Sequence, residues 1–251
     1  KIEQISEERP LEMLTLILKT TSYIEEIVLQ LKKRIFKDCQ KINFKTDFDF
    51  HKLEEINIKL ANNTLNNISD LINEKCEPIL RETNKLNLAK LKTLGEPSRF
   101  TEALSVIIER KFVILRQNLV TEHYLIFCGR FLAKFYQIFN DFIQNCRMVR
   151  KIGAQQLLLD HYTIKSHIQR NILSSDEQTS DNLLKKIILA KSENLEKKLK
   201  LLSSEEFSVK KFCQFFPTFG KTELKKILSI KFGDSADTKK YYKDFETLNK
   251  N

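Results

Sequence analysis

The chain has 251 residues, of which 41% are hydrophobic and 30% are charged. This composition can bury a core and still cover it with charge, which excludes both a disordered chain and a disulfide-stapled mini-protein. Only 5 glycines and 4 prolines are present. Because β-rich folds use these two residues at their turns, the sequence predicts an all-α fold with long helices.

The net charge of +10 comes entirely from the second part of the chain. Residues 1–97 contain 16 basic and 16 acidic side chains, whereas residues 98–251 contain 27 basic and 17 acidic ones. Such asymmetry indicates contact with nucleic acid, lipid headgroups or an acidic protein. The alternative is a solvated, lysine-rich surface, and charge by itself does not decide between the two.

An amphipathic helix is predicted from about Pro10 to Lys41. Proline suits the first turn of a helix, and apolar residues then recur at three- and four-residue steps. These are Leu14, Ile17, Ile24, Val28, Leu31 and Ile35. A phenylalanine-rich connection is expected to follow at residues 42–48.

A second helix is predicted up to about Leu86, with Asp47 or Asp49 as its cap and a kink at Pro78. The sharpest break in this half of the chain lies at residues 94–97. There a glycine can end one helix and a proline can begin the next. A new helix is therefore expected near Ser98.

The following stretch, from Phe100 to Met148, contains no proline and is predicted to form one very long helix or two. Its apolar periodicity slips at residues 120–124, where Thr121 can cap a second piece. We place a domain junction there. Residues 1–120 are predicted to form a first helical bundle and residues 121–251 a second, basic one.

A helix with one apolar face is predicted from Gly153 to Ile168. This face contains Leu157, Leu158, His161, Ile164 and Ile168. Residues 174–181 are predicted to form a polar loop, and a last segment around Phe245 can dock on the bundle. Three further helices are expected, at residues 183–202, 204–216 and 222–231. Short connections between them predict two antiparallel helical bundles in tandem.

Sequence motifs of the common enzyme classes are missing. There is no glycine-rich phosphate loop, HExxH, CxxC or GxSxG motif. His161 and His167 stand six residues apart and so lie on different helix faces, which argues against a shared metal. Adjacent carboxylates such as Glu205 and Glu206 diverge on a helix. The sequence therefore predicts no enzyme activity, no metal and no cofactor.

The cysteines indicate a reducing compartment. The chain has 5, an odd number, widely spaced within apolar stripes. They are Cys39, Cys76, Cys128, Cys146 and Cys213. No apolar run is long enough for a membrane span and no signal peptide is recognisable. We therefore expect a soluble, cytosolic protein, and the lysine at its start suggests a fragment.

Pairs of lysines in the last third of the chain are expected to mark exposed faces. They are Lys185 and Lys186, Lys197 and Lys198, Lys210 and Lys211, Lys225 and Lys226, and Lys239 and Lys240. One basic surface is predicted from Lys221, Lys225, Lys226 and Lys231. Nearby phenylalanines follow helical spacing rather than the interleaving that stacks bases, so the signal for specific nucleic-acid recognition is weak.

Two motifs carry a resemblance to a known family. Residues 153–160, GAQQLLLD, are followed by Lys165 and preceded by the helix that contains LIFCGRFLAKF. Residues 212–233, FCQFFPTFGKTELKKILSIKFG, come later. In this order they resemble the C-terminal region of the vacuolar-protein-sorting fifty-three subunit family of the Golgi-associated retrograde protein (GARP) tethering complex. The resemblance covers about residues 117–233.

The resemblance implies a non-enzymatic part of a tether that captures endosome-derived vesicles at the trans-Golgi network. Subunits of this class are elongated rods of stacked helical bundles, peripheral to trans-Golgi and endosomal membranes. The implied partners are sibling subunits, SNARE proteins and small Golgi GTPases, with anionic membrane as a further contact and no cofactor. A basic helical nucleic-acid-binding module is the alternative that the charge leaves open.

Within the first motif, Gln156, Asp160 and Lys165 are candidates for an interaction surface. The competing interpretation is local, because Gln156 and Asp160 form an i, i+4 pair that stabilises a helix. Leu157, Leu158 and Ile164 are expected to pack in the core.

Overall fold

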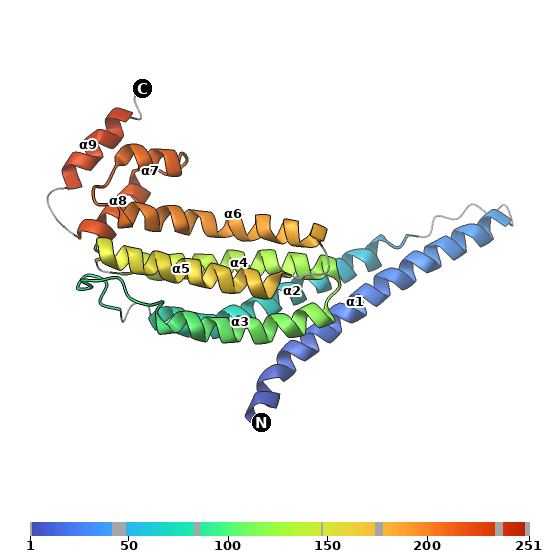
Figure 1. The fold of residues 1–251 in the computed structure, drawn as a ribbon. Helices are drawn as coiled ribbons and strands as arrows, with labels where there is room; N and C mark the ends of the chain where they lie inside the picture. Colours follow the sequence, from blue (N-terminus) through green and yellow to red (C-terminus); the bar gives the residue numbers. More distant parts are fainter. Residues whose placement is uncertain are drawn as a thin grey trace. The chain divides into compact units, whose positions relative to one another are not determined.

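The computed structural model describes residues 2–41, 49–82, 86–146, 148–173, 178–233 and 238–248. Regular secondary structure in these ranges is helical throughout (Figure 1), which confirms the all-α prediction. The predicted connection at residues 42–48 lies outside them. The helices are α1 (Ile2–Lys41), α2 (His51–Leu80), α3 (Arg99–Asn118), α4 (Thr121–Gln144), α5 (Lys151–Ile172), α6 (Gln178–Ser203), α7 (Val209–Phe215), α8 (Lys221–Phe232) and α9 (Thr238–Leu248).

The chain forms two compact units, each made of two separate stretches of sequence. Unit 1 comprises residues 1–73 and 110–131, and unit 2 comprises residues 74–109 and 132–251. The predicted junction between residues 120 and 121 lies within unit 1. That residues 1–120 and 121–251 form separate bundles, the second of them basic, stays a prediction.

In unit 1 the buried face of α1 differs from the predicted stripe. Leu11, Leu18 and Val28 are buried, together with Thr15 and Thr21. The threonine hydroxyls donate to the carbonyls of Glu12 and Leu18, each at 2.8 Å, so they enter the core without an unpaired polar group. Of the predicted stripe, Val28 is buried and Leu31 is 43% exposed, while the other members are half-buried. The most buried face is therefore rotated from the predicted one.

Aromatic packing holds the α3 and α4 parts of unit 1 together. The Phe112 ring lies 5.2 Å from that of Phe127 and 5.1 Å from that of Phe131, measured between centroids. Asn57 of α2 donates through Nδ2 to the carbonyl of Thr21 on α1, at 3.0 Å. In this unit a polar contact thus joins α1 to α2, and aromatic contacts join α3 to α4.

In unit 2, α5 packs along α6 (Figure 1). Leu157 and Ile164 are buried as predicted, but Leu158 is only half-buried. The last helix docks through ring contacts, with the centroid of Phe245 lying 6.1 Å from that of Phe212. The ring contact packs α9 against α7.

Several helix boundaries differ from the prediction. Helix α1 begins at Ile2, so Pro10 lies inside it rather than in its first turn, and α6 begins at Gln178, within the predicted polar loop. Helix α2 passes Pro78 and ends at Leu80 rather than near Leu86. The helix expected from Ser204 is reduced to α7, because Ser208 is extended and its Oγ accepts a hydrogen bond from the Lys211 N–H at 3.3 Å. A capping serine of this kind starts a helix at the next residue.

Candidate functional site

The GAQQLLLD segment faces an irregular segment of the chain, residues 86–98, which we call the connector. Asp160 accepts two hydrogen bonds from Ser98, through Oδ1 from the backbone N–H at 2.7 Å and through Oδ2 from the hydroxyl at 2.8 Å. Gln156 accepts from the Gly95 N–H at 3.0 Å and donates to the Glu96 carbonyl at 2.9 Å. The two side chains thus replace the backbone partners that a helix would supply.

The expectation that Gln156 and Asp160 lie on the surface is wrong. Gln156 is 6% exposed and Asp160 is fully buried. Burial raises the pKa of Asp160, although its hydrogen bonds with Ser98 and Gln156 oppose the rise. The side chains of Gln156 and Asp160 instead form hydrogen bonds with backbone groups of the connector, which need partners when they are buried.

Gly153 completes this arrangement. A Cβ atom at this position would lie 2.3 Å from the carbonyl oxygen of Leu88 in the connector, so only glycine allows the approach. Positions 153, 156 and 160 fall on one face of α5, as their spacing dictates. We call Gly153, Gln156 and Asp160 the connector clamp.

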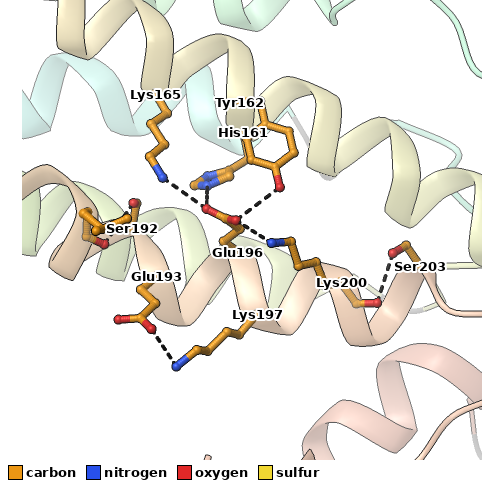
Figure 2. A network of polar contacts seen from close by, with 10 residues as sticks. His161, Tyr162, Lys165, Ser192, Glu193, Glu196, Lys197, Lys200 and Ser203 are labelled. Atoms are coloured by element: carbon orange, nitrogen blue, oxygen red, sulfur yellow. Dashed lines mark hydrogen bonds and ion pairs between the residues drawn. The ribbon is translucent and has the colours of Figure 1, made fainter. Parts of the chain in front are cut away.

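The third candidate of the motif, Lys165, belongs to a different cluster on α5 and α6 (Figure 2). Its Nζ lies 3.1 Å from Oε2 of Glu196, while Lys200 Nζ lies 2.7 Å and Tyr162 Oη 3.1 Å from Oε1. The Lys165 side chain is only 15% exposed. Three donors therefore converge on one carboxylate between the two helices.

His161 lies fully buried beside this carboxylate, with Nε2 at 3.8 Å from Oε2 of Glu196. Its ring packs 5.8 Å from that of Tyr136. Burial lowers the pKa of His161 to about 4, although Glu196 opposes the shift. Burial alone would raise the pKa of Glu196, but the hydrogen bonds from Lys200 and Lys165 outweigh it and lower that pKa to about 2. The neutral His161 ring thus lies beside an ionised carboxylate, and neither of its buried ring nitrogens has a hydrogen-bond partner among the described residues.

The predicted basic surface is only partly present. Lys221, Lys225 and Lys226 are exposed, and Lys221 forms an ion pair with Glu246. Lys231 is buried instead, and its Nζ donates to the carbonyls of Leu202 and Ser204, both at 2.7 Å. The expectation for Lys231 is wrong because the end of α6 presents carbonyls that need donors.

Lys198 is the residue that the sequence reasoning missed. It is 6% exposed, although its pairing with Lys197 suggested an exposed face, and its Nζ donates to the amide oxygen of Asn140. It lines a cavity of about 410 Å³ between α4, α6 and α8. The burial of Lys198 could have been predicted from its spacing, because position 198 lies on the same helix face as the buried Leu195 and Leu202.

The cysteines and acidic groups show no further chemistry. Only Cys76 and Cys128 are buried; Cys39, Cys146 and Cys213 are half-buried. In the part of the chain that the structure describes, no three histidine, cysteine, aspartate or glutamate side chains are grouped to hold a metal ion. Nor does any helix there have the length and apolar character needed to cross a membrane.

The chain is similar in sequence to a curated protein. Over 224 residues the chain is 21% identical to the vacuolar protein sorting-associated protein 53 homolog of Caenorhabditis elegans. The alignment covers 86% of this chain but only 27% of that protein. No family model and no solved structure matches the chain.

Proposed function

We propose that the chain is a non-enzymatic segment of a vesicle-tethering subunit that acts in retrograde transport from endosomes to the trans-Golgi network. The observation that carries this proposal is the similarity to the vacuolar protein sorting-associated protein 53 homolog along 86% of the chain. The all-helical fold agrees with it. We further propose that the segment corresponds to the C-terminal region of such a subunit in the GARP complex, at the cytosolic face of trans-Golgi and endosomal membranes.

Apolar side chains on the surface of unit 1 support contact with sibling subunits. On α1, Leu16 is 58%, Tyr23 63% and Phe36 67% exposed. On α2, Ile56 and Ile58 are each more than half exposed. A patch of large exposed apolar side chains is typical of a surface that another protein covers, and these residues are the candidates for such a patch.

Co-purification tests this proposal. The tagged chain, expressed with the other subunits of the host's GARP complex, should retain them. Leu16→Glu with Tyr23→Glu should reduce their recovery without changing the melting temperature, because both side chains are exposed. Lys33→Glu, also on the exposed surface of α1, is the matched control and should have no effect. A parent chain that retains no sibling subunit would show that the tethering assignment is wrong.

Contact with anionic membrane is a further part of the proposal, supported by the exposed Lys221 and Lys225. Each basic group close to such a surface contributes about 1 kcal/mol of attraction. The parent should float with phosphatidylserine vesicles at low salt, and Lys221→Glu with Lys225→Glu should weaken this. Equal flotation of both would remove the membrane role. SNARE proteins and small Golgi GTPases are proposed partners on the resemblance alone, and the same pull-down tests them.

The nucleic-acid alternative is supported by net charge alone. It predicts binding to duplex or single strands that falls steeply as salt rises, since counterions are released on binding. Tethering predicts no such binding at physiological salt. A salt titration with a fluorescent oligonucleotide therefore separates the two functions.

A further inference from the structure

The cavity in unit 2 combines a ligand-sized volume with an unusual lining. Its volume is about 410 Å³, within the range of small-molecule and peptide pockets. Three lysines contribute to its wall, Lys191 and Lys198 from α6 and Lys226 from α8. Apolar side chains, among them Phe216 and Phe219, line the rest.

The charge of this lining is unbalanced. Glu223 is the single carboxylate among the lining residues, so three lysines against one glutamate leave a charge of +2. Oε2 of Glu223 already accepts a hydrogen bond from the Gly220 N–H at 3.2 Å. Within the described residues no ion pair is formed by Lys191 or Lys226. The lining of the pocket therefore carries an excess of positive charge, which Asp141, outside the lining, opposes at Lys198.

Lys198 makes this imbalance costly. Its ammonium group is buried and donates to a neutral amide, that of Asn140. Burial lowers the pKa of Lys198 to about 8; Asp141 opposes this shift and Lys226 adds to it. A buried cation is stabilised most by an anion at hydrogen-bond distance. A bound carboxylate would supply the partner that the pocket lacks.

The apolar part of the lining narrows the choice of ligand. The Phe216 and Phe219 rings stack with centroids 4.7 Å apart and an angle of 12° between their planes. Ile227 and Ile230 add aliphatic surface, while Phe219 remains half-buried. A free phosphate has no apolar group to place there, whereas a peptide with acidic and apolar side chains has both.

We propose that this pocket binds a short acidic and apolar segment of a partner protein, with a carboxylate between Lys198 and Lys226 and an apolar side chain against Phe216 and Phe219. The proposal rests on the pocket and not on the tethering assignment. Co-purification with sibling subunits can therefore fail while the pocket still binds its peptide, and the reverse also holds.

Fluorescence anisotropy with the isolated chain provides the test. The probe is a fluorescein-labelled peptide that alternates aspartate with leucine and phenylalanine. Two variants carry the same charge change on neighbouring exposed positions of α8, since Lys226 lines the pocket and Lys225 does not. Lys226→Glu should weaken binding about tenfold, and Lys225→Glu less than about twofold. Equal effects of the two variants would overturn the proposal.

Changes in the probe test both halves of the ligand. Replacing its aspartates with asparagines should weaken binding to the parent about as much as Lys226→Glu does, and replacing them with lysines should favour the Lys226→Glu variant. Replacing the leucines and phenylalanines of the probe with serines should abolish binding. If the parent binds no form of the probe, or binds the serine form equally well, the proposal is wrong.

A further experiment distinguishes lipid binding from peptide binding in this pocket. Vesicles of phosphatidylcholine with phosphatidylserine or phosphatidylinositol 4-phosphate are offered to the same variants. Vesicle binding that depends on Lys226 but not on Lys225, together with no binding of the peptide, would assign the pocket to a headgroup and overturn the peptide proposal. The peptide proposal would be supported if the acidic peptide, but not the vesicles, protects Lys198 from chemical acylation.

Discussion

The two units differ in how much large apolar surface they expose, although both bury polar side chains. Unit 2 buries polar side chains and uses them to hold irregular backbone, as Asp160 does for the connector and Lys231 for the end of α6. Unit 1 leaves large apolar side chains in solvent, among them Tyr23 and Phe36. Unit 2 thus uses several buried polar side chains to hold its own backbone, whereas unit 1 exposes an apolar surface suited to a partner.

Energetics explain why buried polar groups fix loops in unit 2. A buried polar group costs free energy unless it is hydrogen-bonded, and an irregular segment has backbone groups that need partners. Each of Gln156, Asp160 and Lys231 meets both needs at once. An exposed apolar side chain costs far less, so unit 1 can keep its surface open for binding.

The largest expected effect comes from placing the same charge in each unit. Leu157→Asp should destabilise unit 2 by about 3 to 5 kcal/mol, because an unpaired charge would be buried. Leu158→Asp should cost less, since Leu158 is half-buried. Leu16→Asp in unit 1 should change stability by no more than about 0.5 kcal/mol. Thermal melting followed by circular dichroism measures all three, and a Leu16→Asp protein as unstable as Leu157→Asp would break the comparison.

The connector clamp provides the next effect. Asp160→Ala removes both acceptors of Ser98 and should cost about 2 to 3 kcal/mol of unfolding free energy. Asp160→Asn retains one acceptor oxygen and should cost less. Urea denaturation measures both variants, and hydrogen exchange at the Ser98 amide should speed up in the alanine protein. An unchanged midpoint for Asp160→Ala would mean that the connector does not depend on the clamp.

Two glycines give opposite predictions for the same substitution. Gly153→Ala brings a Cβ to 2.3 Å from Leu88, and such overpacking costs about 1 to 3 kcal/mol. Gly129 in unit 1 has no atom within 4 Å of the added Cβ, so Gly129→Ala should stabilise α4 by about 0.5 to 1 kcal/mol. Melting temperatures should therefore move in opposite directions. A rise for Gly153→Ala would show that the connector is free to shift.

The pH dependence of stability tests the buried histidine of unit 2. The pKa of His161 is about 4 in the folded chain against 6.5 ordinarily, so the folded state binds fewer protons and loses stability as pH falls from 6.5 towards 4. Between pH 7 and pH 5 this amounts to about 1 to 2 kcal/mol. The lowered pKa of Glu196, about 2 against 4.5 ordinarily, reduces stability only below about pH 5 and so hardly affects the interval from pH 7 to pH 5.

His161→Phe keeps a ring at this position and removes the titration. Its unfolding free energy should therefore depend less on pH across that window than the parent's does, whatever its absolute value. Urea denaturation at several pH values gives both slopes. Identical slopes would mean that His161 titrates in the same way in the folded and unfolded chain.

Helix positions were largely predictable because their signals are local. Thr121 starts α4 as the slip in periodicity indicated, and Gly233 ends α8 with a φ of +65°, the conformation that favours glycine. Asp49 caps α2 by accepting from the His51 N–H at 2.8 Å. Each of these depends on residues within one or two turns.

The clamp could not be predicted, because its partners lie about sixty residues away in sequence. Gln156 and Asp160 look like any polar pair on a helix until the connector is placed against them. Lys198 and Lys231 were different. Position 231 follows Leu224 and Leu228 on the apolar face of α8, so the helical phase already indicated burial, and the charge of lysine was given too much weight.

The smallest expected effect separates this buried lysine from exposed ones. Lys231→Gln shortens the side chain and removes the ammonium that donates to Leu202 and Ser204, leaving carbonyls near the end of α6 without this donor. We expect a loss of about 1 kcal/mol. Lys225→Gln on the same helix, and Lys19→Gln in unit 1, should change stability by less than about 0.5 kcal/mol, because both side chains are exposed.

Burial also lowers the pKa of Lys231, so the folded chain releases this proton at a lower pH than the unfolded chain does. The parent's unfolding free energy should therefore rise as pH approaches 10.5. The difference in unfolding free energy between the parent and Lys231→Gln should therefore change with pH in the alkaline range. The corresponding difference for Lys19→Gln should not. Urea denaturation at neutral and alkaline pH measures both. If all three glutamine variants match the parent, the carbonyls at the end of α6 find other partners and the contrast between buried and exposed lysines fails for this position.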